Sequence, residues 1–316
     1  MPRILLFSLI IFFTSCDPYH FALSHVDKKA RQAGLHYHVE DIDGYTISYW
    51  DSETDEPPLI LVQGLGADAE FHWYKQLKAL KNYRIIMPDL LYFGKSCPPK
   101  DNYSPEEQVK AIGALIRRLD LKKYDLCGFS YGGLIAAEIA RKQPEKIHKL
   151  VLFDAPVKFF VREELQPLLE KFGYREPSQL LVPQNAKAMK NLTSVIYKHP
   201  PHIPVSFYKS FQENMYAKNA EAYKNILRTL EQERKYYETQ EYHFQFPVLL
   251  VWGENDIMVP SEVGKLLESY IGSNAKLYIV KGTAHVPNLE KPTEFNRILT
   301  GFLEPESSQN NATSRR

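Results

Sequence analysis

The sequence predicts an α/β fold: a mostly parallel β-sheet flanked by helices, with a helical lid inserted into the sheet domain. From residue 35 onward, short apolar segments alternate with segments of helical periodicity, a pattern typical of parallel strands joined by helical crossovers. The run 59–62 is continuously apolar, as expected for a strand that is covered on both faces. Residues 157–245 lack clear strands and are interrupted by prolines, which indicates a helical insertion.

The alternation divides the chain into a core, an insertion and a tail. We expect the sheet domain to comprise residues 17–156 and 246–305, the lid residues 157–245, and a disordered tail residues 306–316. The predicted strands are 35–40 and 45–50, which form a hairpin, then 59–62, 83–87, 124–129, 150–153, 247–252 and 275–280. The predicted helices are 21–34, a segment through 73–80, one capped by Ser104, and 134–142, 262–270 and 293–303.

Composition and charge exclude several classes of protein. The chain has 316 residues, of which 44% are hydrophobic and 24% are charged, as in a packed globular protein. Its 39 lysines and arginines nearly balance its 38 aspartates and glutamates, which leaves a net charge of +1. A balance of this kind gives no electrostatic reason to expect a nucleic-acid partner or a polybasic membrane patch.

The N-terminal residues 1–16 have the pattern of a signal peptide. Arg3 precedes an apolar run at residues 4–13, and small residues follow. As a helix this run reaches about 15 Å, half of a hydrocarbon core, so a spanning helix is disfavoured. The end of the segment, Phe13-Thr14-Ser15-Cys16, resembles a bacterial lipobox, although that motif prefers an aliphatic residue in place of Phe13. We therefore expect lipidation of Cys16 and a location in the cell envelope, attached to a membrane and facing outside the cytoplasm; an ordinary signal peptide or a short signal anchor are the alternatives.

A candidate nucleophile lies between a predicted strand and a predicted helix. The sequence Gly128-Phe129-Ser130-Tyr131-Gly132 fits G-x-S-x-G. In that motif a strand turns sharply into a helix and projects the serine hydroxyl, and small residues on either side let the two elements approach. The motif alone is weak, but the strand before it and the helix after it support Ser130 as a nucleophile.

A serine hydroxyl needs an adjacent base, and that base needs an orienting carboxylate. Of ten histidines, His285 directly follows the last predicted strand, and loops at the carboxyl ends of parallel strands converge. Asp256 follows the strand 247–252, with Glu254 as a local competitor. The order Ser130, Asp256, His285 along the chain is the order that α/β-hydrolases use.

Amide donors for an oxyanion are expected at two positions. One is the backbone N–H of Tyr131, the residue after the nucleophile. The second comes from Gln63-Gly64-Leu65-Gly66, which follows the strand 59–62, and Leu65 is the most suitable donor in it. A simple glycine-rich turn is the alternative interpretation of that segment.

Together these residues resemble the α/β-hydrolase superfamily over roughly residues 35–303, and most of all its monoacylglycerol-lipase and carboxylesterase branch. The segments that carry the resemblance are 61–67, 88–96 and 128–133. The chain departs from the family in having Gln63 where histidine is usual, and Leu91 and Tyr92 where arginine and glycine are usual. The resemblance implies hydrolysis of carboxylic esters of small acyl lipids, with no metal or organic cofactor. Aromatic residues of the lid are candidate walls for an acyl pocket: Phe159, Phe160, Tyr197, Phe207, Tyr208 and Phe211.

Other functions remain open on the sequence alone. A carbon–carbon bond hydrolase acting on ring-cleavage products shares the triad and the lid, and haloperoxidase-like and thioesterase activities are further options. Epoxide hydrolases and haloalkane dehalogenases need a carboxylate where this chain has Ser130. A non-catalytic envelope lipoprotein with a hydrolase fold is the alternative from a different class. The oligomeric state is not readable from the sequence.

Overall fold

The structure of the protein, a computed structural model, describes residues 17–159 and 165–304. The predicted signal peptide with Cys16, residue Phe160 and the predicted tail 306–316 lie outside the described residues. Eight strands form one sheet in the order β1-β2-β4-β3-β5-β6-β7-β8. The strands are β1 His36–Ile42, β2 Tyr45–Asp51, β3 Pro58–Val62, β4 Arg84–Pro88, β5 Tyr124–Phe129, β6 Ile147–Phe153, β7 Val248–Gly253 and β8 Ala275–Val280.

The sheet is mostly parallel, as predicted. Only β2 runs against its neighbours, pairing antiparallel with β1 and with β4. The six strands from β4 to β8 in the sheet order are parallel, so their carboxyl ends lie along one edge. Strand β6 begins at Ile147, three residues before the predicted start. The apolar pattern misses these residues because two of them have polar side chains, which form hydrogen bonds outside the strand. His148 contacts the buried Asp125, and Lys149 donates to carbonyls at the end of the chain's last helix.

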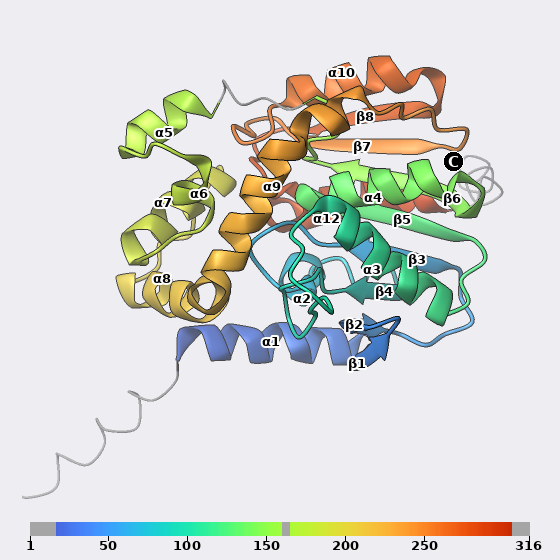
Figure 1. Ribbon diagram of the computed structural model, residues 1–316, viewed down its shortest axis with the longest axis horizontal. Coiled ribbons are helices and arrows are strands. Elements are labelled where there is room, and N and C mark those ends of the chain that lie inside the picture. Colours follow the sequence, from blue (N-terminus) through green and yellow to red (C-terminus); the bar gives the residue numbers. More distant parts are fainter. Residues whose placement is uncertain (1–16, 160–164, 305–316) are drawn as a thin grey trace, which may run out of the picture.

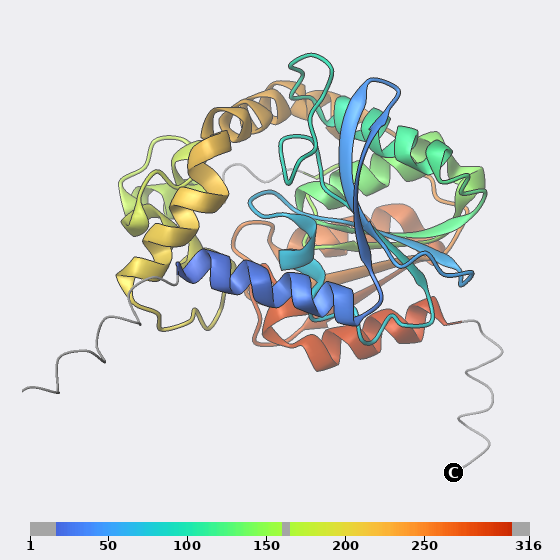
Figure 2. The same cartoon turned by 90° about the horizontal axis from the view of Figure 1, so that it is seen from below.

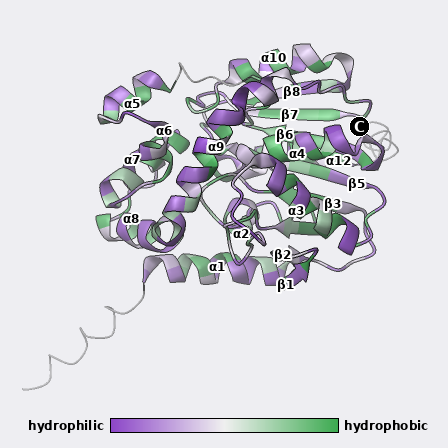
Figure 3. Cartoon of the chain, in the orientation of Figure 1, coloured by the Kyte–Doolittle hydropathy of each residue, from purple (hydrophilic) through white to green (hydrophobic). Residues whose placement is uncertain are grey.

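Helices cover both faces of the sheet, as Figure 2 shows with α3 and α4 on one side and the last helix on the other. Alternate residues of each central strand pack against α3, α4 and α10 on one face and α1, α2 and α12 on the other. In Figure 3 strand β7 is hydrophobic throughout, in keeping with burial of both its faces. The covering helices are α1 Pro18–Gln32, α2 Ala69–Trp73, α3 Pro105–Arg118, α4 Tyr131–Lys142, α10 Ser261–Ile271, α11 Pro287–Glu290 and α12 Pro292–Leu303.

The first two helices differ from the prediction. Helix α1 begins at Pro18, before the predicted start, because the side chain of Asp17 caps it by accepting the amides of Tyr19 and His20. The predicted helical segment through 73–80 is wrong in its second half. Helix α2 ends at Trp73, and short turns follow in which the buried Gln76 donates to Asn288 and Asn296 instead.

The segment between β6 and β7 is helical and lies beside the sheet, on the left of Figure 1. We call residues 157–245 the insertion. Its α-helices are α5 Gln166–Phe172, α6 Pro177–Leu181, α7 Ala186–Ile196, α8 Val205–Phe211 and α9 Ala220–Thr239. Between the last two lie the π-helical segment η3 Gln212–Tyr216 and the 3-10 helix η4 Ala217–Asn219. Two further short turns, η2 Pro144–Lys146 and η5 Gly272–Asn274, lie in the sheet domain. Among the helices in the described part of the chain, none has the length and apolarity needed to cross a bilayer.

Candidate active site

Ser130 occupies the sharp turn between β5 and α4. Its backbone has φ 50° and ψ −122°, a conformation that non-glycine residues rarely adopt. The amide of Ser130 donates to the carbonyl of Phe153 at 3.0 Å, which fastens the turn to the neighbouring strand β6. The strained turn therefore projects the hydroxyl beyond the carboxyl edge of the sheet.

The glycines around Ser130 are required by close packing. A Cβ atom at Gly128 would lie 2.5 Å from the carbonyl oxygen of Gly132. A Cβ atom at Gly132 would lie 2.1 Å from the carbonyl oxygen of Gln63, in the loop after β3. The G-x-S-x-G spacing thus brings the nucleophile turn against the segment that the sequence predicts to supply an oxyanion donor.

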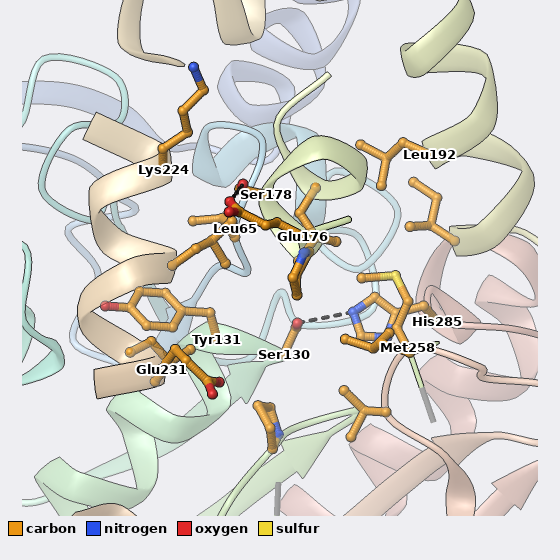
Figure 4. A pocket seen from close by; sticks show the side chains of 18 of the residues that line it. Leu65, Ser130, Tyr131, Glu176, Ser178, Leu192, Lys224, Glu231, Met258 and His285 are labelled. Carbon is orange, nitrogen blue, oxygen red and sulfur yellow. Dashed lines mark hydrogen bonds between the residues drawn. The ribbon is translucent and has the colours of Figure 1, made fainter. Parts of the chain in front are cut away.

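The structure brings Ser130, His285 and Asp256 together in one hydrogen-bonded chain. Nε2 of His285 lies 3.0 Å from Oγ of Ser130, as Figure 4 shows, and Nδ1 lies 2.7 Å from Oδ2 of Asp256. A carboxylate accepts, so Nδ1 donates and Nε2 is left as an acceptor facing the hydroxyl. The side chains of His285 and Asp256 are 4% and 0% exposed, and this burial keeps water from competing for the two bonds.

Asp256 is also held from behind. Its Oδ1 accepts the backbone amides of Met258 at 2.8 Å and Val259 at 3.1 Å. Glu254, the local competitor, turns away and accepts the amide of Gly282 at 2.9 Å on the surface. The structure therefore places Asp256, and not Glu254, against His285.

The two predicted oxyanion donors, Tyr131 and Leu65, line the same cavity as Ser130. Tyr131 is the first residue of α4, and the first amides of a helix have no acceptor within the helix. Leu65 lines the cavity above Ser130, and the close approach of its loop needs glycine on both sides. A Cβ at Gly64 would lie 2.8 Å from the ring of Phe129, and Gly66 has φ 111°.

Gln63 explains how the loop tolerates the departure from the family's histidine. It is fully buried, and its Nε2 donates to the carbonyl of Ala67 at 2.7 Å, which closes the loop on itself. The backbone amides are thus held in place by a side chain that takes no part in the hydrogen-bonded chain of the triad.

The sequence analysis did not identify Asp154, a fully buried carboxyl group beside Asp256. One oxygen of Asp154, one oxygen of Asp256 and one ring nitrogen of His285 all lie within 4.8 Å of one another. Burial and the charge of Asp256 raise the pKa of Asp154 well above its ordinary value, so Asp154 holds a proton. The signal available in the sequence was its place directly after β6, at the same edge of the sheet as the other site residues.

These three residues are also the group in the described part of the chain whose donor atoms could converge on a metal ion. The short contact between Nδ1 of His285 and Asp256 needs a proton on that nitrogen, which removes the lone pair that a metal would bind. The arrangement therefore suits proton transfer better than metal binding.

His72 is a second buried group that the sequence analysis did not connect with the site. It lines the cavity, packs against Phe129 with ring centroids 5.3 Å apart, and leaves its Nε2 without a hydrogen-bond partner. Burial, with a smaller effect from His285, lowers the pKa of His72 to about 4. His72 is therefore neutral near neutral pH and places no second positive charge beside His285.

A cavity of about 800 Å³ opens above Ser130 between the sheet domain and the insertion. Its apolar lining includes Leu65, Leu181, Leu192, Ile196, Leu227 and Met258, and its charged lining includes Arg175, Glu176, Lys224, Arg228, Glu231 and Arg234. The charged residues all come from the start of α6 and from α9. The cavity thus has an apolar wall around the triad and a charged side formed by the insertion.

The insertion does supply an aromatic wall of the cavity, Tyr216, but it is not one of the residues predicted for this role. The cavity lining contains none of Phe159, Tyr197, Phe207, Tyr208 and Phe211. Phe159 packs against Tyr270, and Phe211 packs against Tyr19 and Phe71. These two side chains join the insertion to its surroundings. The cavity is lined by leucine, isoleucine and methionine side chains together with Phe129, Tyr131 and Tyr216.

The fold and this site together define the class of protein. A family model for the alpha/beta hydrolase fold matches residues 57–292, and the chain belongs to this family.

Curated relatives of the chain have several different activities. It is 29% identical over 239 residues to Lipase 1 of Psychrobacter immobilis, covering 74% of this chain and 72% of the lipase. It is 24% identical over 306 residues to Epoxide hydrolase 4 of Homo sapiens, covering 90% and 80%. It is 25% identical over 278 residues to a 2-hydroxy-6-oxononadienedioate/2-hydroxy-6-oxononatrienedioate hydrolase of Paraburkholderia xenovorans, covering 84% and 93%.

Solved structures show the same range. The structure of a membrane phospholipase A matches with a TM-score of 0.74 and 26% identity, covering 90% of this chain and 91% of that one. The meta-cleavage product hydrolase of Pseudomonas fluorescens matches with a TM-score of 0.71 and 22% identity, covering 84% and 97%. The second likeness shows the shared fold alone.

Proposed function

We propose that this protein is a serine hydrolase that cleaves carboxylic esters of small acyl lipids through an acyl-enzyme on Ser130. The observation that carries the proposal is the hydrogen-bonded chain Ser130–His285–Asp256 at the base of an apolar-walled cavity of about 800 Å³. At a water-sized share of about 30 Å³ per heavy atom, this volume corresponds to roughly 27 heavy atoms. A glycerol ester of one long fatty acid has about that size.

In the first step Oγ of Ser130 attacks the ester carbonyl carbon. Nε2 of His285, 3.0 Å away, takes the hydroxyl proton, and Asp256 stabilises the imidazolium through the bond to Nδ1. The carbon–oxygen bond of the tetrahedral intermediate then breaks. The alcohol leaves with the proton from His285, and the acyl group stays on Ser130.

The negative charge of the tetrahedral intermediate needs donors above the serine. The amides of Tyr131 and Leu65, two residues that line the cavity with Ser130, are the groups assigned to this role. Tyr131 begins a helix of twelve residues, and the partial positive charge of a helix N-terminus favours an anion at this point.

In the second step water attacks the acyl-enzyme. His285 removes a proton from the water and returns it to Oγ of Ser130, which releases the carboxylic acid and regenerates the free serine. His72 supports this cycle by remaining neutral, because a second imidazolium in the same buried space would disfavour the charged state of His285.

A second candidate is hydrolysis of a carbon–carbon bond in a vinylogous diketone, which is favoured by the likeness to ring-cleavage-product hydrolases. The lipase relative and the membrane phospholipase favour the ester reaction. The likeness to an epoxide hydrolase does not extend to the nucleophile, because epoxide opening in that class uses a carboxylate where Ser130 stands.

The test is a substrate panel with purified full-length protein: p-nitrophenyl esters of rising acyl length, monoacylglycerols and a vinylogous diketone. We expect turnover of the esters and the monoacylglycerols that is lost in Ser130→Ala. Turnover of the diketone without ester turnover would replace the ester proposal by the carbon–carbon one, and turnover of neither would contradict both.

We further propose attachment to a membrane of the cell envelope through lipidation of Cys16, which supports a lipid substrate by proximity. The apolar run at residues 4–13 and the sequence Thr14-Ser15-Cys16 support this proposal. Metabolic labelling with palmitate tests it: we expect label in the wild type and none in Cys16→Ser. Equal labelling of the two proteins would contradict it.

A further inference from the structure

One surface of the insertion is basic although the whole chain is nearly neutral. From residue 177 to residue 212 the sequence has no aspartate or glutamate. The same segment contains six lysine and histidine side chains, all exposed: Lys187, Lys190, Lys198, His199, His202 and Lys209. Among the described residues, only Lys209 of the four lysines pairs its side chain with a carboxylate, Glu213 at 3.7 Å. The carboxylate of Glu290 accepts the backbone amides of Lys198 and His199 and leaves the Lys198 side chain without an ion pair in the described part of the chain. The net charge of +1 therefore hides a local excess of positive charge on α7, α8 and the loop between them.

Exposed hydrophobic side chains lie on the same elements and on the adjoining helix α1. The two most exposed large hydrophobic residues in the described chain are Phe21 on α1 and Val205 at the start of α8, at 71% and 66%. Helix α8 contacts both α1 and α7, so these exposed basic and apolar side chains lie on neighbouring elements. Basic and apolar side chains together bind the headgroup and acyl regions of an anionic bilayer.

Helix α1 is firmly joined to α8, as Figures 1 and 2 both show. Oγ of Ser210 donates to Asp17 at 2.6 Å and accepts the amide of Tyr19 at 3.0 Å. The ring of Tyr19 packs against Phe211 with centroids 5.6 Å apart. The start of α1 and the end of α8 thus form one packed unit.

The N-terminal segment that precedes the described residues connects to the chain at the start of α1. Residues 1–16, with their apolar run at 4–13, stop directly before Asp17, the cap of α1. An apolar or lipidated segment that enters a bilayer would therefore hold α1 and α8 within a residue or two of the membrane surface.

From these observations we infer that the exposed side of α1, α7 and α8, here called the basic face, rests on an anionic lipid surface. The inference adds an orientation and a lipid charge to the proposed function, on which it rests for its purpose. Helix α7 also lines the cavity through Leu192 and Ile196, so a docked basic face brings a wall of the cavity to the lipid that holds the substrate.

Fluorescence quenching tests the orientation. The native tryptophans Trp50, Trp73 and Trp252 are at most 2% exposed, so an added surface tryptophan reports its own contacts. Full-length Val205→Trp is compared with Leu266→Trp, whose site on α10 is 51% exposed and lies at the opposite edge of the molecule. Both carry Ser130→Ala, so the binding result does not depend on whether the protein is an esterase.

We expect brominated lipids in phosphatidylglycerol vesicles to quench the added emission of Val205→Trp and to leave that of Leu266→Trp unchanged. Equal quenching of the two, or quenching of neither, would overturn the orientation. Shielding of Val205→Trp without lipid, with self-association, would assign the face to a second copy of the chain and overturn it too.

The lipid charge is tested by reversing lysines. In the Val205→Trp protein, Lys187→Glu, Lys190→Glu and Lys198→Glu together should raise the lipid concentration for half-maximal quenching about tenfold or more. The control replaces the exposed Lys122, Lys123 and Lys265 by glutamate, with the same change in net charge, and should cause little shift. Equal effects of the two sets, or equal quenching by neutral phosphatidylcholine vesicles, would overturn an anionic lipid as the partner.

Discussion

Asp154 and Asp256 lie beside each other in the buried space behind His285, with one oxygen of each within 4.8 Å of the other and of a ring nitrogen of the histidine. Oδ1 of Asp154 accepts the amide of Gly253 at 2.9 Å, whereas its Oδ2 is buried and has no partner unless it carries a proton. Two carboxylates cannot both be charged at such a separation without water. Burial and the neighbouring Asp256 therefore raise the pKa of Asp154, which favours a proton on this carboxyl group.

Asp154→Asn and Asp154→Leu separate this role from simple packing. Asparagine has about the same shape and retains a donor toward Asp256, so kcat/KM should stay within a fewfold of the wild type. Leucine fills the space without a donor, and we expect a loss of about tenfold or more, because the Asp256 carboxylate then faces an apolar group instead of a proton donor. Ester hydrolysis by the two variants is the measurement, and equal activity of both would contradict a role for a proton donor at position 154.

The same proton makes stability depend on pH. The unfolded chain ionises Asp154 near pH 3.9, whereas burial keeps it protonated in the folded chain. The folded state thus binds more protons, so this group's contribution to stability is present below about pH 3.9 and declines as the pH rises towards the raised pKa. Asp154→Asn removes this titrating group, so the free energy of unfolding of the variant should fall less steeply with rising pH than that of the wild type. Urea unfolding of both proteins at pH 5 and pH 6 measures it, and parallel slopes would contradict a protonated Asp154.

Ser130→Ala should lower kcat by about 10⁴-fold or more, because the proton acceptor at His285 then has no nucleophile to activate. Labelling by a fluorophosphonate probe should disappear in the same variant. Because the side chain loses one atom at a half-buried position, the melting temperature should change little. Persistent labelling of the variant would place the reactive group elsewhere.

Gly132→Ala tests the packing of the nucleophile turn. The new Cβ would lie 2.1 Å from the carbonyl oxygen of Gln63, so the turn and the oxyanion loop must move apart, at a cost of about 3 kcal/mol or more. Gly301→Ala is the matched control, since no atom lies within 4 Å of its added Cβ and it lies inside α12. The control should gain up to about 1 kcal/mol from helix propensity. Similar melting temperatures for the two variants would contradict the packing argument.

Leu192→Trp tests the assignment of the cavity to the acyl chain. Leu192 lines the cavity from α7, so a larger side chain there should shorten the chain that fits. We expect esters of long acids to lose about tenfold or more in kcat/KM while those of short acids are nearly unchanged. Leu192→Met preserves the volume and should keep the wild-type profile. A uniform loss over all chain lengths would contradict the assignment.

The sheet, and the three residues that the structure joins in a hydrogen-bonded chain, could be predicted from the sequence because both depend on local signals. Strand β8 has the predicted bounds, since its apolar run is bordered by glycine and polar residues. The prediction for strand β6 is too short at its start. Lys149 is a polar residue inside the strand, and it donates to acceptors more than 150 positions away in the sequence. No local pattern can show such a partner.

The site shows the same division. Ser130, Asp256 and His285 each follow a strand and could be placed by their motifs. Asp154 also follows a strand, but its raised pKa depends partly on Asp256, which lies at the end of the neighbouring strand β7. The sequence alone does not show that these two carboxyl groups are close. The aromatic residues predicted to line the cavity do not line it, and Phe159 and Phe211 pack between elements instead. The sequence could not show this, because the direction of a side chain on an irregular helical segment depends on tertiary contacts.

The register of β6 against β7 has one more consequence. Leu150 pairs with Val248 and Phe153 with Val251, so the strands that border the insertion are hydrogen-bonded neighbours. The insertion therefore begins after one strand and ends before the strand next to it in the sheet. The segments that carry Ser130, Asp256 and His285 are not part of the insertion. Substrate choice can then change by exchanging residues 157–245 as a cassette while the reacting groups stay fixed, which makes this chain a natural scaffold for grafting specificity.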